Sequence, residues 1–194
     1  MGNNKTHFVH ANFRYLREDD TQNPLHFINV LCGQETTLYY LKQDVLNLVK
    51  TAYSYGEEFY GSTGKSYAYD QIQLVKVVEI MNVLHSSGLD LSPGNIRSYE
   101  NSYPSLSLEE KNDIRIFLAD FFTFRSLDGW EELLDDLLIH AYKEGSEGFF
   151  DNVREPFRIM VYLEKLTEAI FLVYEILRLK ESYPKASGEV AEPS

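Results

Sequence analysis

Residues 128–141 read DGWEELLDDLLIHA, and the spacing of their apolar side chains decides the fold class. The apolar residues fall at positions i, i+3, i+4, i+7, i+8 and i+11, which is the stripe that an amphipathic helix presents to a core. They are Trp130, Leu133, Leu134, Leu137, Leu138 and Ala141. Asp128 precedes the stripe as a capping side chain and Gly145 follows it, so we predict a helix between them.

The helical period also covers the first half of the chain. The dipeptide Asn23-Pro24 places a capping side chain before a proline at the first helical position, which predicts a short helix. Longer helices are expected over residues 35–55 and 70–87. The second of these is apolar over much of its circumference, so we expect it to lie at the centre of the fold and to end at Gly88.

The second half of the chain begins with a loop. Residues 89–106 contain two prolines and four serines without a sustained period, which is typical of a long surface connection. Ser107 and Glu110 have the spacing of a capping box, which predicts the start of the next helix. A last helix is expected over residues 156–182, with a length of roughly 40 Å at 1.5 Å per residue.

These segments predict an all-α fold, an antiparallel bundle of five or six helices with one long loop near residues 89–106. Residues 24–183 are expected to form a single domain, and residues 184–194 a disordered tail. Residues 1–23 are ambiguous but are expected to pack on the bundle. Within them, residues 5–17 suit a helix, although their aromatic content would also suit a strand.

Composition narrows the class of partner. The 194 residues carry 18 Lys and Arg against 30 Asp and Glu, a formal net charge of −12. Such a charge disfavours binding to a phosphate backbone, so we expect no nucleic-acid ligand and favour a basic protein partner. Hydrophobic residues make up 44% of the chain, which is ample material for one core.

Three features favour a cytoplasmic location and no membrane association. Cys32 has no second cysteine to pair with, so the fold does not require an oxidising compartment. No stretch approaches the roughly 20 apolar residues that span a bilayer. The N-terminus lacks the apolar core of a secretory signal. Its first residues, MGNNKT, fit the pattern for N-myristoylation but lack the basic second signal for stable anchoring, so lipidation stays open.

Residues 61–66, GSTGKS, resemble a phosphate-binding loop only in part. The loop needs a glycine five positions before the glycine of its G-K-[ST] end, and Phe59 stands there instead. The motif also follows a predicted helix rather than a strand. We interpret it as a solvated turn between helices. The alternative is a generic anion site in which Lys65 supplies the charge and Ser66 a donor.

Tyrosines gather around this loop. Five of the chain's 14 tyrosines fall within residues 53–69, mixed with serine and glycine. They are Tyr53, Tyr55, Tyr60, Tyr67 and Tyr69. This composition is typical of binding loops, because tyrosine offers a large rigid contact area with a polar tip. The alternative is that the rings cover the ends of the core with their hydroxyls in water.

The helix after Asp128 carries a second candidate surface. Glu131, Glu132, Asp135 and Asp136 form an acidic ridge that we expect opposite the apolar stripe. Such a ridge would steer a basic partner and raise its association rate. The alternative is a solvated helix face whose first acids complement the helix dipole.

Motifs for catalysis and metal binding are missing from the sequence. No histidine follows a glutamate at the Glu-x-x-His spacing of bundle metal sites, and His7 with His10 makes an incomplete site. Cys32 lies in an apolar segment and is interpreted as a small buried hydrophobe. We therefore expect no catalytic residue, no metal and no cofactor.

Two functions remain open on these grounds. The first is a non-enzymatic binding or regulatory protein, inhibitor-like or immunity-like, that engages a basic partner through the acidic ridge and the tyrosine-rich loop. The alternative is an enzyme or a small-molecule or anion-binding bundle with a pocket between helices, in which the GSTGKS loop takes part. The predicted helix 156–182 is too apolar for a surface helix, so either it runs through the bundle centre, covered by helices 35–55 and 70–87, or part of it meets another copy. We expect a homodimer through it.

Overall fold

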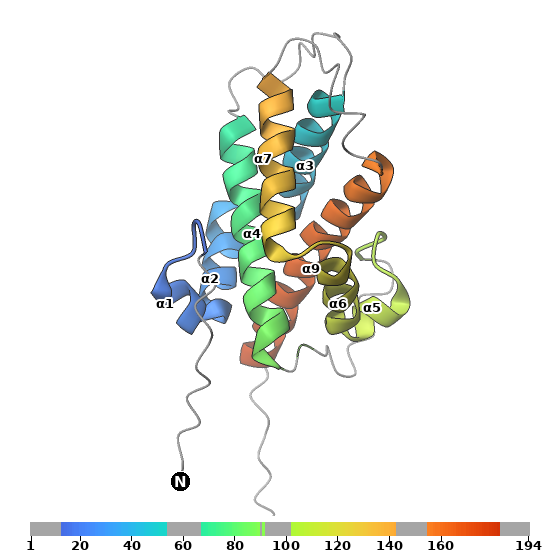
Figure 1. The fold of residues 1–194 in the computed structure, drawn as a ribbon. Coiled ribbons are helices and arrows are strands. Elements are labelled where there is room, and N and C mark those ends of the chain that lie inside the picture. The colour runs from blue at the N-terminus through green and yellow to red at the C-terminus, as the bar shows by residue number, and fades with distance from the viewer. Residues whose placement is uncertain (1–12, 54–66, 90, 92–101, 143–154, 183–194) are drawn as a thin grey trace, which may run out of the picture.

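The computed structural model describes residues 13–53, 67–89, 91, 102–142 and 155–182 (Figure 1). Within these ranges the chain forms helices and no strand, which confirms the predicted all-α bundle. The elements in chain order are α1 (Glu18–Gln22), α2 (Pro24–Val30), the π-helix η1 (Leu31–Glu35), α3 (Leu38–Tyr53), α4 (Tyr67–Ser87), α5 (Leu108–Asn112), α6 (Ile114–Phe124), α7 (Leu127–Tyr142) and α9 (Pro156–Ser182).

Four long helices make the bundle. In Figure 1, α3 and α7 run upward whereas α4 and α9 run downward, so these helices alternate in direction along the chain. α3, α4 and α7 pack against one another, and α9 packs on α3 and α4. The short helices α1, α2, α5 and α6 lie around the lower part of the bundle in the same view. These short elements raise the number of described helices above the predicted five or six.

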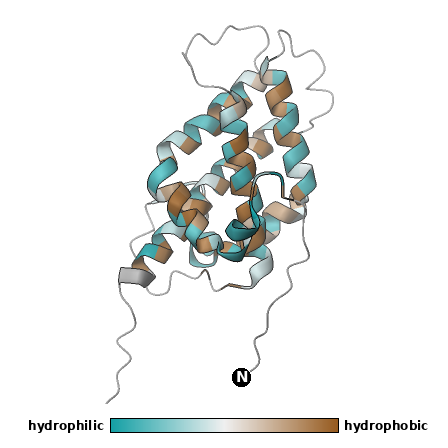
Figure 2. Cartoon of the chain, turned by 90° about the vertical axis from the view of Figure 1, so that its left-hand side faces the viewer, coloured by the Kyte–Doolittle hydropathy of each residue, from teal (hydrophilic) through white to brown (hydrophobic). Residues whose placement is uncertain are grey.

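The central position predicted for α4 is confirmed. Its apolar side chains from Leu74 to Met81 are fully buried, including neighbours in sequence such as Val77 and Val78. Adjacent residues of a helix point in directions about 100° apart, so burial of both requires cover on more than one side. The helix ends at Gly88, whose φ of 65° is the left-handed conformation that glycine accepts without strain. Figure 2 shows hydrophobic residues, in brown, recurring along the helices of the bundle.

Trp130 fixes the corner between α6 and α7. Its ring is stacked on that of Phe121, with 4.2 Å between centroids and 5° between planes. Its Nε1 donates to the Phe121 carbonyl oxygen at 3.1 Å, which satisfies the polar atom of a buried side chain. The predicted cap at Asp128 is wrong, because α7 begins at Leu127 and Ser126 Oγ accepts from the backbone N–H of Gly129 at 3.2 Å.

Two predicted helix starts are confirmed. Asn23 accepts from the backbone N–H of His26 at 3.3 Å, ahead of Pro24. The capping box is complete, since Ser107 Oγ accepts from the Glu110 N–H at 3.2 Å while the Ser107 N–H donates to the Glu110 carboxylate at 2.7 Å. The helix after this box is shorter than expected. Asp113 is extended and caps a new helix, α6, so the expected single helix is divided in two.

In the first part of the chain, the structure departs from the expected helical bounds at two places. Phe13–Arg17, the described end of the expected helix 5–17, is not helical, because its amides are bound by a side chain of α4. The expected helix 35–55 begins only at Leu38, since η1 ends at Glu35 and Thr36 is extended. Residues 54 and 55, Gly56, Gly145, most of the loop 89–106 and the tail 184–194 lie outside the described residues.

α9 has the predicted bounds and is 27 residues long. Leu163, Leu166 and Ile170 on it are fully buried inside the bundle. Its apolar excess is therefore accounted for by packing within one chain, while Phe157 in its first turn is 80% exposed. The homodimer stays a prediction. Within the described ranges, no helix combines the length and the apolar character that crossing a membrane requires.

Leu134→Ala should lower the free energy of unfolding by about 2–5 kcal/mol, because it leaves a cavity beneath α7 where Leu134 is fully buried. Leu108→Ala is the matched control, since Leu108 is 57% exposed, and should cost less than about 1 kcal/mol. Urea denaturation followed by circular dichroism measures both. Equal losses in the two variants would contradict the packing of α7.

Candidate functional site

Charged and polar side chains from three distant parts of the chain meet beside α4 and α7. Arg14 precedes α1, whereas Glu131 and Asp135 lie one helical turn apart on α7. The Arg14 Nε lies 2.7 Å from Glu131 Oε2, and its Nη1 pairs with Asp135 Oδ2. Gln71 of α4 donates to the other oxygen of Asp135 at 2.7 Å. We call Glu131 and Asp135 the arginine seat.

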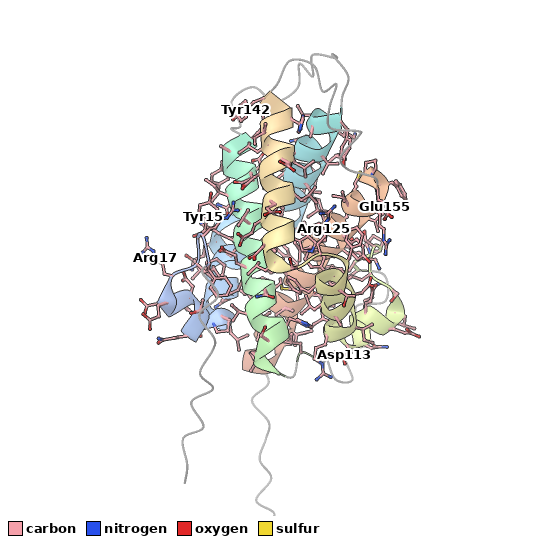
Figure 3. The ribbon with its side chains drawn as sticks, in the orientation of Figure 1. Tyr15, Arg17, Asp113, Arg125, Tyr142 and Glu155 are labelled. Carbon is pink, nitrogen blue, oxygen red and sulfur yellow. The ribbon has the colours of Figure 1, made fainter. Side chains whose placement is uncertain are left out.

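Arg14 belongs to a segment of irregular backbone, residues 13–17, that we call the strap. The backbone N–H groups of Arg14, Tyr15 and Leu16 all donate to the carboxylate of Glu79 in α4, Tyr15 at 3.2 Å and Leu16 at 3.0 Å. Leu16 is buried, while Tyr15 lies at the surface beside α4 (Figure 3). Glu79 is fully buried and supplies the acceptors that a helix would otherwise offer to these amides.

A second buried glutamate does the same for another connection. Glu168 of α9 is fully buried and accepts from the backbone N–H groups of Ser105 at 2.8 Å and Leu106 at 3.2 Å. Lys42 of α3 pairs with the same carboxylate. Each of these two glutamates therefore holds one irregular segment against the bundle.

The environment of the arginine seat favours a bound cation. Burial raises the pKa of Glu131 above its usual range, and the Arg14 charge opposes this rise. Burial likewise raises the pKa of Glu79, against the hydrogen bonds from the strap amides. The hydrogen bond to Asp135 raises the pKa of Arg14. Two carboxylates thus contact the Arg14 guanidinium and a third, Glu79, accepts from the Arg14 backbone N–H, while the buried Oε1 of Glu131 accepts no hydrogen bond from any described residue.

The acidic ridge expected on this helix is divided into two parts. Glu131 is buried, and it pairs with Arg14 as Asp135 does, so these two do not form a free solvated face. Glu132 and Asp136 are exposed. Neither of them forms an ion pair with a described residue. We expected all four acids to be exposed on one ridge, and of these four only Glu132 and Asp136 are exposed and unpaired by described residues.

The open part of the ridge continues into apolar side chains. Ile139 is 47% exposed and Tyr142 is 59% exposed, and both follow Glu132 and Asp136 along one side of α7. Asp128 is exposed at the start of the same side. We call these five residues the acidic face. Tyr142 lies at the upper end of the bundle in Figure 3.

The predicted tyrosine cluster is described in part. Tyr53 is half-buried, and burial raises the pKa of its hydroxyl to about 12. Tyr67 is half-buried and accepts from Thr51 Oγ1 at 3.4 Å, while Tyr69 is 51% exposed. Among the described tyrosines of this cluster, Tyr69 is thus the one whose ring is exposed to solvent. Tyr55, Tyr60, Lys65 and Ser66 lie outside the described residues, as does the whole GSTGKS loop.

Two contacts bring the tyrosine cluster next to the acidic helix. The Tyr67 ring meets the Tyr142 ring edge to face, with 5.6 Å between centroids. One turn further along α4, Gln71 holds Asp135. The two candidate surfaces that are far apart in sequence are therefore neighbours along the α4–α7 pair.

Sequence reasoning missed Arg14, Glu79 and Tyr142. Arg14 carried no signal, because the partners of its guanidinium lie more than a hundred residues away. Glu79 did carry one, since it interrupts the apolar run VVEIM within a helix that was expected to be buried on most sides. A charged residue at such a position must find hydrogen-bond donors inside the fold.

No described group of three or more His, Cys, Asp and Glu side chains is arranged to hold a metal ion. His7 and His10 lie outside the described residues. Cys32 is buried, and desolvation raises the pKa of its thiol to about 12, so it stays protonated at neutral pH. This agrees with its interpretation as a small hydrophobe.

Glu79→Ala should release the strap, because three backbone donors lose their acceptor. Hydrogen–deuterium exchange at residues 14–16 should become at least about tenfold faster, with residues 105–106 unchanged. Glu168→Ala is the reciprocal control and should speed exchange at residues 105–106 only. Equal exchange at the strap in wild type and Glu79→Ala would show that this carboxylate does not hold it.

Glu131 should also affect stability in a pH-dependent way. Its raised pKa means that the folded protein binds this proton at higher pH than the unfolded chain, so the group adds stability as the pH falls and withdraws it as the pH rises. The unfolding free energy of wild type minus that of Glu131→Gln should therefore increase between pH 7 and about pH 4.5. Urea titrations at several pH values measure this difference, with Glu132→Gln as the exposed control. A difference that is flat with pH, or falls on acidification, would contradict the burial of Glu131.

Comparison with protein-family models, with curated proteins and with solved structures finds no match for this chain. The arginine seat, the strap and the acidic face are therefore interpreted from their own geometry and charge.

Proposed function

We propose that this chain is a non-enzymatic binding protein, inhibitor-like or immunity-like, that engages a basic protein partner through the acidic face of α7. The observation that carries the proposal is the combination on one exposed helix side of Glu132 and Asp136, unpaired by described residues, with Ile139 and Tyr142. Acids steer a basic partner toward the surface. Exposed aromatic and aliphatic side chains then supply contact area that is buried on binding.

The size of the face sets a requirement on the rest of the interface. From Asp128 to Tyr142 it extends roughly 21 Å at 1.5 Å per residue. A standard interface covers about 800 Å² on each partner and involves about 20–30 residues, which is more than one helix side offers. Tyr67 and Tyr69 of the adjoining α4 extend the surface at the Tyr142 end, where the Tyr67 ring meets the Tyr142 ring.

The overall charge supports the same class of partner. A net charge of −12 favours encounter with basic proteins and disfavours nucleic acid. Glu132 and Asp136 lie beside the core stripe of α7 and outside the arginine seat, so they contribute charge to the surface without a structural role among the described contacts. A cytoplasmic location remains a prediction from the sequence.

Glu132→Lys with Asp136→Lys should weaken partner capture while leaving the fold intact. The change moves the net charge from −12 to −12 + 4 = −8. Asp19→Lys with Glu109→Lys makes the same change at exposed positions of α1 and α5 and is the matched control. Glu131 and Asp135 are left unchanged because they hold Arg14.

Capture from lysate, quantified by mass spectrometry, measures the effect. At least one protein should be recovered equally by wild type and the control pair, and about tenfold less by the Glu132/Asp136 pair, since each desolvated charge contact is worth on the order of 1 kcal/mol or more. Melting temperatures must agree among the three proteins. Equal recovery of every captured protein would overturn the role of the acidic face.

A further inference from the structure

Arg14 shows how α7 binds a basic side chain. Its guanidinium lies between Glu131 and Asp135. The residues that follow these two in the sequence, Glu132 and Asp136, are exposed. An arginine from residues 13–17 thus already occupies acidic groups that border the acidic face. Within the described chain this is a bound example of the chemistry that the proposed function requires.

The arginine seat is only partly satisfied by this occupant. A guanidinium binds a carboxylate best through two parallel hydrogen bonds to both oxygens. Arg14 instead divides its donors, giving Nε to one oxygen of Glu131 and Nη1 to Asp135. Glu131 is 5% exposed, and its second oxygen is buried without a donor from the described residues. A buried acceptor left in this way costs about 1–3 kcal/mol, so a differently approaching arginine could be bound more tightly.

The rest of the strap is bound as an extended peptide is. Main-chain N–H groups of Arg14, Tyr15 and Leu16 go to Glu79, and the Leu16 side chain is buried. Tyr15 is exposed, and Arg17 points away from the bundle (Figure 3). The acceptors that hold residues 14–16 lie on α4 and α7, whereas the Arg17 N–H donates to Asp20 of α1 at 2.8 Å. Main-chain bonds of this kind do not depend on side-chain identity, so arginine and the buried aliphatic residue two positions later carry the specificity.

We propose that the arginine seat is a binding site for an extended segment of the basic partner, and that the strap of the same chain occupies it when the partner is absent. The partner segment has an arginine followed two residues later by a large aliphatic side chain. This inference rests on the proposed function and adds its regulation. The partner first meets the acidic face and then displaces the strap. The strap competes with the partner, so weakening it raises the affinity of the site for such a segment.

Full-length wild type, Arg14→Gln and Arg17→Gln test this competition. The probe is the fluorescein-labelled, terminally blocked pentapeptide FRYLR, which copies residues 13–17, and the reference probe is FQYLR. Arg17→Gln changes the same charge in the same segment without touching the seat. By fluorescence polarisation, FRYLR should bind Arg14→Gln at least about tenfold more tightly than it binds either wild type or Arg17→Gln. FQYLR should bind all three proteins weakly and alike.

Hydrogen–deuterium exchange at residues 14–16 is measured on the same proteins. It should be faster in Arg14→Gln than in Arg17→Gln, which shows that the seat holds the strap. Equal exchange in these two variants, or FRYLR binding that is no tighter to Arg14→Gln, overturns the proposal. The assay contains no partner protein, so such a result removes the strap mechanism while the test of Glu132 and Asp136 stands separately.

Discussion

A buried carboxylate in the middle of α4 must find hydrogen-bond donors, and much of the first part of the fold follows from that constraint. Glu79 is fully buried among apolar neighbours, where an unpaired charge would cost several kcal/mol. The donors are backbone N–H groups of the strap, which have no helical carbonyl to bind. Each partner therefore satisfies the other, and the strap is positioned so that Arg14 reaches α7. Glu168 repeats the arrangement in α9 for residues 105–106.

α7 uses its sides for different purposes. Trp130 and Leu134 pack into the core, Glu131 and Asp135 bind Arg14, and Glu132 and Asp136 remain open to solvent. Because an α-helix turns by about 100° per residue, neighbouring acids in the sequence fall into different environments. The contacts of Glu131 and Asp135 with Arg14 thus leave only Glu132 and Asp136 of these four acids for the proposed interaction surface. In the proposed mechanism a basic segment and the strap bind to the same carboxylates, which would couple the two events.

The main helices could be predicted because their causes are local. The apolar period, Asn23 before Pro24, the box of Ser107 with Glu110 and the left-handed Gly88 each act within a few residues, and each is found in the structure. Local reasoning failed where a competing local group or a distant one intervened. Ser126 replaced Asp128 as a cap, Asp113 divided a helix, and Glu79 bound amides that were expected to be helical.

The sequence by itself determined the all-α class, the central place of α4, the bounds of α9 and the acidic character of α7, because periodicity and charge are properties of short windows. The tertiary structure decided which acids are open, which are paired and which tyrosines meet the acidic helix. Arg14 and Asp135 are 121 residues apart in the chain, and Tyr67 and Tyr142 lie on different helices. Their contacts depend on how whole helices pack, and a single sequence contains no direct measure of that packing.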